Sequence, residues 1–320
     1  MSALWAPMST HPLKGGVWSA TPTPFADDWS LDVPSVRRLV EHHIAMGVTG
    51  VMLAGTCGEG PWMRLGDRET LTRTAVEAAR GRLRIALQVT DNSAARVLDN
   101  IGKAAAWGAE VAVVEAPYFF LNATPERLLG HYREIARGSP LPMGLYDRGK
   151  ASAFAMPESQ LPALLAEPNI AMVKDSSMTE SRRDLYLAAR RARPGLVVLT
   201  GGEFDTVAYL KAGYDGALLG GGIFNARLAL RILEAVRAGN LDGAGKVQAR
   251  MNDLMYRVYG GPKIECWLSG LKELLVQMGI FTTRRNLLEY PLTAECLAQI
   301  RAALDGSDGL GYRKDLLGSV

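Results

Sequence analysis

The hydrophobic positions of this chain gather into eight short apolar runs, spread over its first two thirds. Each run is continuously apolar rather than alternating, which is typical of strands buried on both faces of a parallel sheet. The runs occupy residues 17–20, 50–54, 83–89, 111–116, 142–146, 170–173, 196–199 and 216–219. We therefore predict eight strands.

Segments with helical periodicity separate the predicted strands. In residues 36–44, apolar side chains recur three and four positions apart, the spacing of one helical face. Similar patterns predict helices around residues 71–78 and at 94–107, 125–136, 157–165, 180–192, 204–212 and 227–237. Capping signals support these limits: Asp67-x-x-Thr70, Thr124-Pro125 and Met156-Pro157 indicate helix starts, and Gly108, Gly138 and Gly213 indicate ends.

Eight strand–helix units in this length predict an α/β fold of the (β/α)8 (TIM) barrel type. A doubly wound open sheet is the alternative, but the GxGxxG turn expected after its first strand is absent. Beyond the eighth unit, three more helices at 241–259, 264–278 and 294–304 predict a C-terminal helical extension. We place the barrel at 15–238, the extension at 239–305 and flexible termini at 1–14 and 306–320.

The composition adds limits on location and partners. With 320 residues, 48% of them hydrophobic, and a formal net charge of +3, the chain predicts a large core and binding to neither nucleic acid nor membrane. Its three cysteines are widely spaced and form no CxxC pair, which favours a reducing compartment. No signal-peptide pattern or apolar run of transmembrane length is present. We expect a cytoplasmic protein.

The carboxyl ends of the strands are where a barrel carries its chemistry. Lys174, directly after the run 170–173, is the only lysine at such an end. Burial disfavours the charged ammonium, and a neutral amine can attack a carbonyl to form a Schiff base. A lysine there can equally extend into solvent or pair with Asp175, so its neighbours must decide between the two interpretations.

Two further strand ends supply matching groups. Tyr146 ends the preceding strand and can transfer a proton, while Thr56 offers a second hydroxyl. Gly55 and Gly58 allow the backbone N–H groups of Thr56 and Cys57 to turn toward a ligand carboxylate. Each residue alone also fits a structural role, Tyr146 in the barrel core and the others in a turn. Their joint position at strand ends favours a site.

Metal chemistry is not expected. The four histidines, His11, His42, His43 and His131, lie in the N-terminal arm or on predicted helices. Carboxylates at strand ends are scattered, whereas a magnesium site needs two or three that converge. They are Asp91, Asp147, Asp175 and Glu203. We therefore predict neither a metal nor another cofactor.

Three motifs together resemble one superfamily. The segment 55–59 (GTCGE), Tyr146 and the segment 173–177 (VKDSS) are similar to the signatures of the dihydrodipicolinate synthase / N-acetylneuraminate lyase superfamily. The likeness extends from about residue 16 to residue 293. It implies a barrel enzyme of the class I, imine-forming type, with Lys174 as the Schiff-base lysine and Tyr146 as the catalytic tyrosine. It also implies pyruvate or another 2-keto acid as substrate. Enzymes of this superfamily are usually homotetramers.

Several positions depart from the pattern of the synthases in this superfamily. Cys57 replaces a hydroxyl residue, and Phe119 stands where synthases carry the second tyrosine of a Pro-Tyr-Tyr motif. Ala151 occupies the position of the arginine that holds a semialdehyde carboxylate, although Arg148 lies nearby. The order Tyr-Asp-Arg at 146–148 is closer to dehydratases of 2-keto-3-deoxy sugar acids.

The sialic acid lyases differ as well, because they place an acid next to the position of Glu203, where this chain has Phe204. We expect a Schiff-base lyase, an aldolase or dehydratase, that acts on pyruvate or a 2-keto acid, such as a 2-keto-3-deoxy sugar acid. The alternatives are dihydrodipicolinate synthase itself and a non-catalytic homologue that binds 2-keto acids. We expect a homotetramer or homodimer.

The expected site residues follow from the motifs and the resemblance together. Lys174, Tyr146 and Thr56 are the catalytic candidates. The candidates for substrate binding are Thr56, Cys57, Arg148, Gly201, Glu203 and Gly220.

Overall fold

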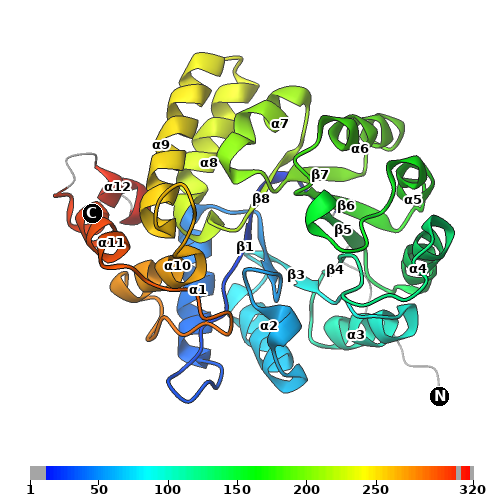
Figure 1. Cartoon of the computed structure of the whole chain (residues 1–320), viewed down its shortest axis with the longest axis horizontal. Coiled ribbons are helices and arrows are strands. Elements are labelled where there is room, and N and C mark those ends of the chain that lie inside the picture. Colours follow the sequence, from blue (N-terminus) through cyan, green and yellow to red (C-terminus); the bar gives the residue numbers. More distant parts are fainter. Residues whose placement is uncertain (1–11, 308–310, 318–320) are drawn as a thin grey trace.

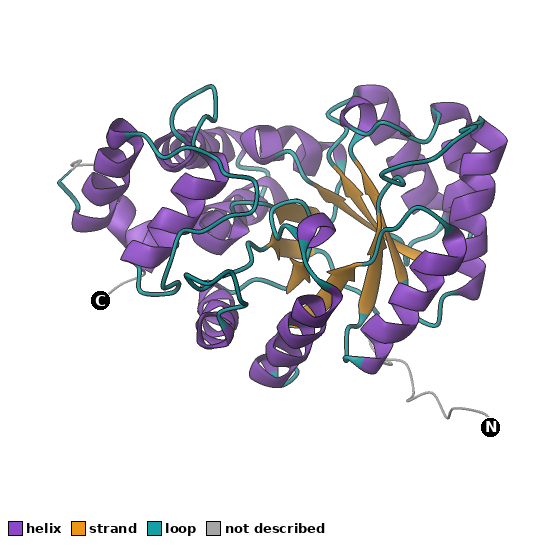
Figure 2. Ribbon diagram, turned by 60° about the horizontal axis from the view of Figure 1, so that its bottom comes forward, coloured by secondary structure: helices purple, strands orange, loops and turns teal. Residues whose placement is uncertain are grey.

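The computed structural model describes residues 12–307 and 311–317 and contains a closed barrel of eight parallel strands. Figure 2 shows the strands inside a ring of helices. In barrel order, the strands are β1 (Gly16–Ala20), β2 (Gly50–Leu53), β3 (Arg84–Gln88), β4 (Val111–Val114), β5 (Met143–Asp147), β6 (Ile170–Asp175), β7 (Val197–Thr200) and β8 (Gly216–Leu219). The predicted fold and all eight predicted strands are confirmed.

One helix or helical segment follows each strand and covers the outside of the barrel (Figure 1). These are α1 (Val33–Met46), α2 (Leu65–Ala79), α3 (Ala94–Ala106), α4 (Pro125–Gly138), α5 (Leu161–Leu165), α6 (Glu180–Ala192), α7 (Thr206–Ala212) and α8 (Gly222–Arg237). The cap predicted at Thr124 is present, since its side chain accepts a hydrogen bond from Arg127 N at 3.3 Å. The start predicted at Asp67 is wrong: α2 begins at Leu65, and Asp67 lies in its first turn.

Two apolar clusters separate the inside of the barrel from its outside. The inner cluster contains alternate residues of the strands, including Met52, Val113 and Tyr146. The residues between them, such as Val114, belong to the larger cluster between strands and helices. Because successive side chains of a strand point to opposite faces, this division fixes which strand-end residues face inward.

A β-bulge interrupts this alternation in β6. Met143 pairs with Ile170, but the next residue of β5, Gly144, pairs with Met172, so Ala171 is extra. Ile170 consequently belongs to the outer cluster, whereas Met172, two residues later, belongs to the inner one. Every residue of β6 after the bulge therefore has the opposite orientation from the one that an uninterrupted strand would give it.

The C-terminal extension packs beside the barrel against α8 and α7, on the side shown at the left of Figure 1. It comprises α9 (Leu241–Tyr259), α10 (Trp267–Gln277), α11 (Ala294–Asp305) and α12 (Tyr312–Leu317). No helix in the part of the chain that the structure describes is both long and apolar enough to cross a membrane.

The predicted limits of three further helices also differ from the structure. Only Leu161–Leu165 of the segment predicted at 157–165 is α-helical, after a 3-10 turn at Glu158–Gln160, because Pro162 has no N–H to continue the ladder. The helix predicted from residue 264 starts at Trp267, since Ile264 has a positive φ of 56° that no α-helix accommodates. The predicted eighth helix starts earlier, at Gly222.

The termini were expected to be loose. Residues 1–11, 308–310 and 318–320 lie outside the described residues. Within the predicted tail, however, Tyr312–Leu317 forms α12, where we expected no regular element. Its Tyr312 and Leu316 are buried, and Asp315 is paired with Arg231 and Arg250, so tertiary contacts stabilise a helix that is too short to form alone.

Candidate active site

Lys174 and Tyr146 meet at the carboxyl end of the barrel. The two residues are directly paired across β5 and β6, and both are inward-facing. The Lys174 Nζ atom lies 4.1 Å from the centre of the Tyr146 ring. Lys174 is 6% exposed and Tyr146 is 7% exposed, so the amine is held in a largely dehydrated place against an aromatic face. The structure thus brings together the two central residues predicted from the sequence.

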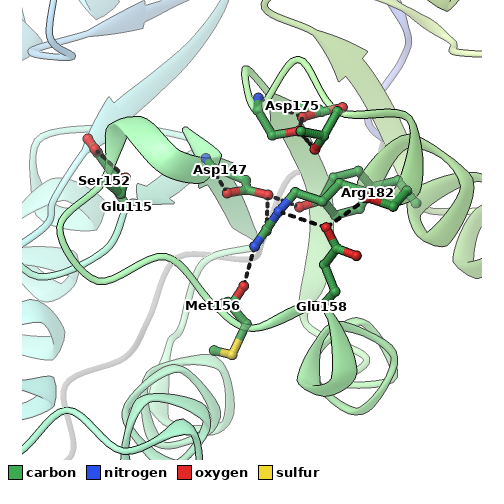
Figure 3. Close-up of polar contacts among 12 residues, drawn as sticks. Glu115, Asp147, Ser152, Met156, Glu158, Asp175 and Arg182 are labelled. Atoms are coloured by element: carbon green, nitrogen blue, oxygen red, sulfur yellow. Dashed lines mark hydrogen bonds and ion pairs between the residues drawn. The ribbon is translucent and has the colours of Figure 1, made fainter.

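The carboxylates next to them face the other way. Asp147 accepts hydrogen bonds from Arg182 Nη1 at 2.6 Å and from the Tyr186 hydroxyl, both on α6 (Figure 3). Asp175 accepts a hydrogen bond from the Tyr214 hydroxyl at 2.7 Å. Asp147 and Asp175 thus bond to side chains outside the barrel and not to the groups inside it. The pairing of Lys174 with Asp175, considered from the sequence as an alternative, is therefore not the arrangement of the fold.

The loop after β2 is compact and packs against the end of β8. The Cys57 thiol is buried and lies 3.9 Å from the Gly220 carbonyl oxygen, and burial raises the pKa of this thiol. A side chain at Gly58 would lie 2.9 Å from both Ala54 N and Thr21 O, so this position requires glycine. Thr56 remains partly exposed at the barrel mouth.

Glu59, the last residue of that loop motif, has a role that the sequence did not indicate. Its carboxylate lies 2.5 Å from Lys272 Nζ on α10, and both side chains are fully buried. The same carboxylate accepts a hydrogen bond from Leu287 N at 2.5 Å, and Lys272 also donates to Arg285 O at 2.7 Å. The helical extension thus holds the β2 loop in place through a buried ion pair.

Glu203, Gly201 and Gly220 form the rim beyond β7 and β8. The Glu203 carboxylate accepts hydrogen bonds from Gly221 N at 3.0 and 3.1 Å and one from the Tyr259 hydroxyl at 3.4 Å. Burial raises the pKa of Glu203, although these bonds and the charge of Lys174 oppose the shift. The Glu203 carboxylate is therefore already bonded to groups of the protein. Gly201 and Gly220 have no side chains and leave the rim open.

A second cluster of polar side chains lies at the carboxyl ends of β3, β4 and β5, and Arg148 is the member of it that the sequence predicted. Arg148 Nη1 donates to Glu115 Oε1 at 3.1 Å, and Gln88 Nε2 donates to Glu115 Oε2 at 3.3 Å. Gln88 and Glu115 were missed from the sequence. The available signal was their position directly at the ends of buried strands. Arg148 was predicted to bind substrate, and the structure pairs it with a carboxylate.

Other features lie outside this centre. Asp91 pairs with Arg96 at 2.7 Å and lines a hollow of about 480 Å³ between α2 and α3, which does not include Lys174. Among residues 12–307 and 311–317, no three His, Cys, Asp or Glu side chains are grouped so as to hold a metal ion. The geometry is that of a barrel with one inward lysine against one tyrosine.

Comparison with known proteins identifies the family of the chain. The model of the Dihydrodipicolinate synthetase family matches residues 13–305, so the chain belongs to this family. The family's members are Schiff-base aldolases and lyases of class I, and the chain is therefore an enzyme of that class.

Individual relatives carry two different names. A 4-hydroxy-tetrahydrodipicolinate synthase of Exiguobacterium sp. is 32% identical over 91% of this chain and 97% of its own length. An N-acetylneuraminate lyase of Rhizobium meliloti is 29% identical over 74% of this chain and 78% of its own. The solved dihydrodipicolinate synthase of Bacteroides thetaiotaomicron superposes with a TM-score of 0.83 at 24% identity, covering 93% of this chain and all of that one.

Proposed function

We propose that this protein is a Schiff-base lyase in which Lys174 attacks the C2 carbonyl of a 2-keto acid. The observation that carries the proposal is the dehydrated contact between Lys174 Nζ and the Tyr146 ring, 4.1 Å apart at the mouth of the barrel. Attack of the neutral amine forms a carbinolamine, and loss of its hydroxyl as water leaves a protonated imine.

Tyr146 is the general acid and base of this sequence of steps. Its phenol protonates the hydroxyl of the carbinolamine, which leaves as water. The resulting phenolate then takes a proton from the substrate. In a dehydratase this proton comes from C3, and the phenol then gives it to the C4 hydroxyl, which leaves as water. In an aldolase it comes from the C4 hydroxyl, and the C3–C4 bond breaks. In both cases the imine nitrogen accepts the electron pair, and Thr56 links the phenol to further proton carriers.

The carboxylate of the substrate is assigned to the backbone N–H groups of Thr56 and Cys57. The loop is closed by bonds from Glu59 N to Thr56 O and from Gly60 N to Gly55 O, each 3.1 Å. These bonds use other N–H groups than the two assigned to the ligand. The buried thiol of Cys57 takes no part in the reaction, since its raised pKa keeps it protonated. Gly201 and Gly220 leave room for the ligand.

For the second part of the substrate we propose a hydroxylated carbon chain, as in 2-keto-3-deoxy sugar acids. Arg148 is paired with Glu115, and Ala151 offers no guanidinium, so nothing in this region favours a second carboxylate. Phe119 is 62% exposed and carries no hydroxyl for a proton relay. The alternatives are the synthase reaction, for which the relative from Exiguobacterium sp. is named, and a homologue that binds 2-keto acids without turnover.

Reduction with borohydride tests the proposal. Pyruvate and borohydride together should attach a stable adduct to Lys174, because reduction converts the imine into an amine that cannot be hydrolysed. Mass spectrometry of the digested protein locates the adduct, and Lys174→Arg, which keeps a cation but removes the reactive amine, serves as control. An adduct on another residue, or none with any 2-keto acid, would refute the mechanism. Trapping without turnover of any sugar-derived keto acid would favour the binding homologue.

We also propose a homotetramer or homodimer. The support is an exposed apolar group after β4, in which Phe119 is 62% and Leu121 is 72% exposed. Light scattering measures the mass directly, and replacement of both residues by serine should lower it. A monomer with the unaltered chain would contradict this proposal without affecting the Schiff-base mechanism.

A further inference from the structure

Two polar side chains face the interior of the barrel at the same end as Lys174. In β3, Ala86 belongs to the inner cluster and Leu87 to the outer one, so Gln88 returns to the interior. In β4, Val113 is inner and Val114 is outer, and the same alternation turns Glu115 inward. Neither residue has a part in the mechanism described above.

Their position relative to the reacting groups follows from the register of the strands. Val114 pairs with Leu145, so Glu115 is at the level of Tyr146 on the neighbouring strand, and Tyr146 in turn pairs with Lys174. Adjacent strands are about 4.8 Å apart. Glu115 therefore lies on the side of Tyr146 opposite to Lys174, about two strand spacings or roughly 10 Å from the lysine, a distance that a six-carbon keto acid attached to Lys174 can span.

The protein holds the Glu115 carboxylate from three directions. Arg148 donates at 3.1 Å, Gln88 at 3.3 Å and the Ser152 hydroxyl at 3.4 Å. Glu115 is only 4% exposed, whereas the Arg148 side chain is 34% exposed. The charges of Glu115 and Arg148 cancel, and the guanidinium of Arg148 is the part of the cluster that a ligand can reach.

The amide oxygen of Gln88 adds an acceptor that the protein itself does not use. Gln88 is 1% exposed, and its Oε1 atom is buried without a hydrogen-bond partner, while its Nε2 atom donates to Glu115 and to the Tyr118 hydroxyl. A side chain built at Gly55 would approach this oxygen to 3.3 Å, which places it beside the loop assigned to the substrate carboxylate. A buried acceptor without a partner is costly, and a ligand hydroxyl can satisfy it.

We propose that Glu115, Gln88 and Arg148 form a subsite for hydroxyl groups on the substrate carbons beyond C3, and that this subsite selects hydroxylated 2-keto acids over those with a second carboxylate. The inference rests on the Schiff-base function proposed above. A hydroxyl can donate to Glu115 or Gln88 and accept from Arg148. A second carboxylate meets the charge of Glu115, and Arg148 cannot bind it without giving up that partner.

The test compares three probes in borohydride trapping on Lys174, which needs no turnover. Pyruvate has no distal group, 2-keto-3-deoxygluconate has distal hydroxyls, and 2-oxoglutarate has a second carboxylate. Glu115→Gln should raise the half-saturating concentration of 2-keto-3-deoxygluconate roughly ten- to hundredfold, the value of a hydrogen bond to a charged group. The pyruvate value should change less than about threefold, because the subsite contributes nothing to that ligand.

The same variant should bind 2-oxoglutarate more tightly than the unaltered chain, because Arg148 loses its charged partner. A gain of this kind cannot result from misfolding. Glu110→Gln is the matched control, since Glu110 pairs with Arg84 at the opposite end of the same strand and should leave all three values unchanged.

The outcomes separate the two proposals. If no 2-keto acid is trapped on Lys174 of the unaltered chain, both fail. If pyruvate is trapped but Glu115→Gln changes all three probes equally, or none of them, only the subsite is refuted.

Discussion

At the scale of single residues, the chemistry depends on which face of a strand each side chain occupies. Tyr146 and Asp147 are neighbours in β5, yet the phenol faces Lys174 and the carboxylate binds Arg182. The inward residue reacts and the outward residue attaches the strand to a helix. Substitutions at adjacent positions should therefore have different effects.

Tyr146→Phe removes only the phenol oxygen. We expect a stable protein whose turnover falls by about 100- to 10,000-fold, the usual contribution of a positioned acid or base. Steady-state kinetics and thermal unfolding measure the two effects. Asp147→Asn is the contrasting control, because it should lower stability by weakening the bond to Arg182. Normal turnover of Tyr146→Phe would make Tyr146 a residue of the core alone.

His43 provides a pH-dependent contribution to stability. It is fully buried and bonded to Leu39 O and to the Ser19 hydroxyl, and burial, with a smaller effect of His42, lowers its pKa to about 3. The unfolded chain takes up this proton below a pH of about 6.5, whereas the folded protein takes it up only near the lowered pKa. The stability is therefore complete above the unfolded pKa and declines as the pH falls from there.

From pH 7 to pH 5 this histidine alone should lower the free energy of unfolding by about 2 kcal/mol. Denaturant titrations at both pH values measure the loss, and His43→Gln should lose about 2 kcal/mol less between them than the unaltered chain does. Equal losses in the two proteins would show that His43 does not titrate differently on folding.

At the scale of elements, the β2 loop is attached to α10 by the pair Glu59–Lys272. Both side chains are fully buried, so neither charge is stabilised by water when the other is removed. The loop supplies the groups assigned to the substrate carboxylate, and its position depends on a helix outside the barrel.

Lys272→Met should lower the free energy of unfolding by about 3–5 kcal/mol, because it leaves the Glu59 carboxylate buried without a cation. The double variant Glu59→Gln/Lys272→Met should recover part of this loss. Urea unfolding provides the measurement. The exposed pair Arg37–Glu77 is a suitable control, since removal of such a pair costs about 1 kcal/mol or less. A loss as small as the control's would show that Glu59 finds another partner.

At the scale of the whole molecule, the barrel and the place of Lys174 at a strand end followed from the sequence because both depend on local patterns, whereas the inward direction of Lys174 depends on the β-bulge at Ala171. Continuous apolar runs indicated the strands, and Lys174 stood alone at a strand end. The pair Glu59–Lys272 did not follow, since its partners are 213 positions apart. The ion pair Glu115–Arg148 was missed because an acid after a strand gives no sign of the face it occupies. That face depends on the register of the complete sheet.

The enzyme should be a poor 4-hydroxy-tetrahydrodipicolinate synthase. That reaction places a second substrate carboxylate near Arg148, which Glu115 already occupies, and Ala151 supplies no substitute. Imine formation with pyruvate should persist, because it uses the loop at Thr56 instead. A coupled assay with pyruvate and aspartate semialdehyde, beside a keto-acid cleavage assay, measures both. Synthase turnover of several per second, within the ordinary range of enzymes, would contradict this expectation.

The bulge at Ala171 makes β6 tolerant of a change in chain length on one side only. Ala171 has no partner in β5, and removing it would leave Met172, Val173 and Lys174 opposite the same three residues in a regular ladder. A variant lacking Ala171 should therefore still form the borohydride adduct with pyruvate. One residue inserted between Met172 and Lys174 should instead turn the amine toward the helices, because successive side chains of a strand alternate between its faces. That variant should form no adduct even where circular dichroism shows a folded barrel. In the codons of β6, an error of three nucleotides is harmless before Met172 and abolishes the reaction after it.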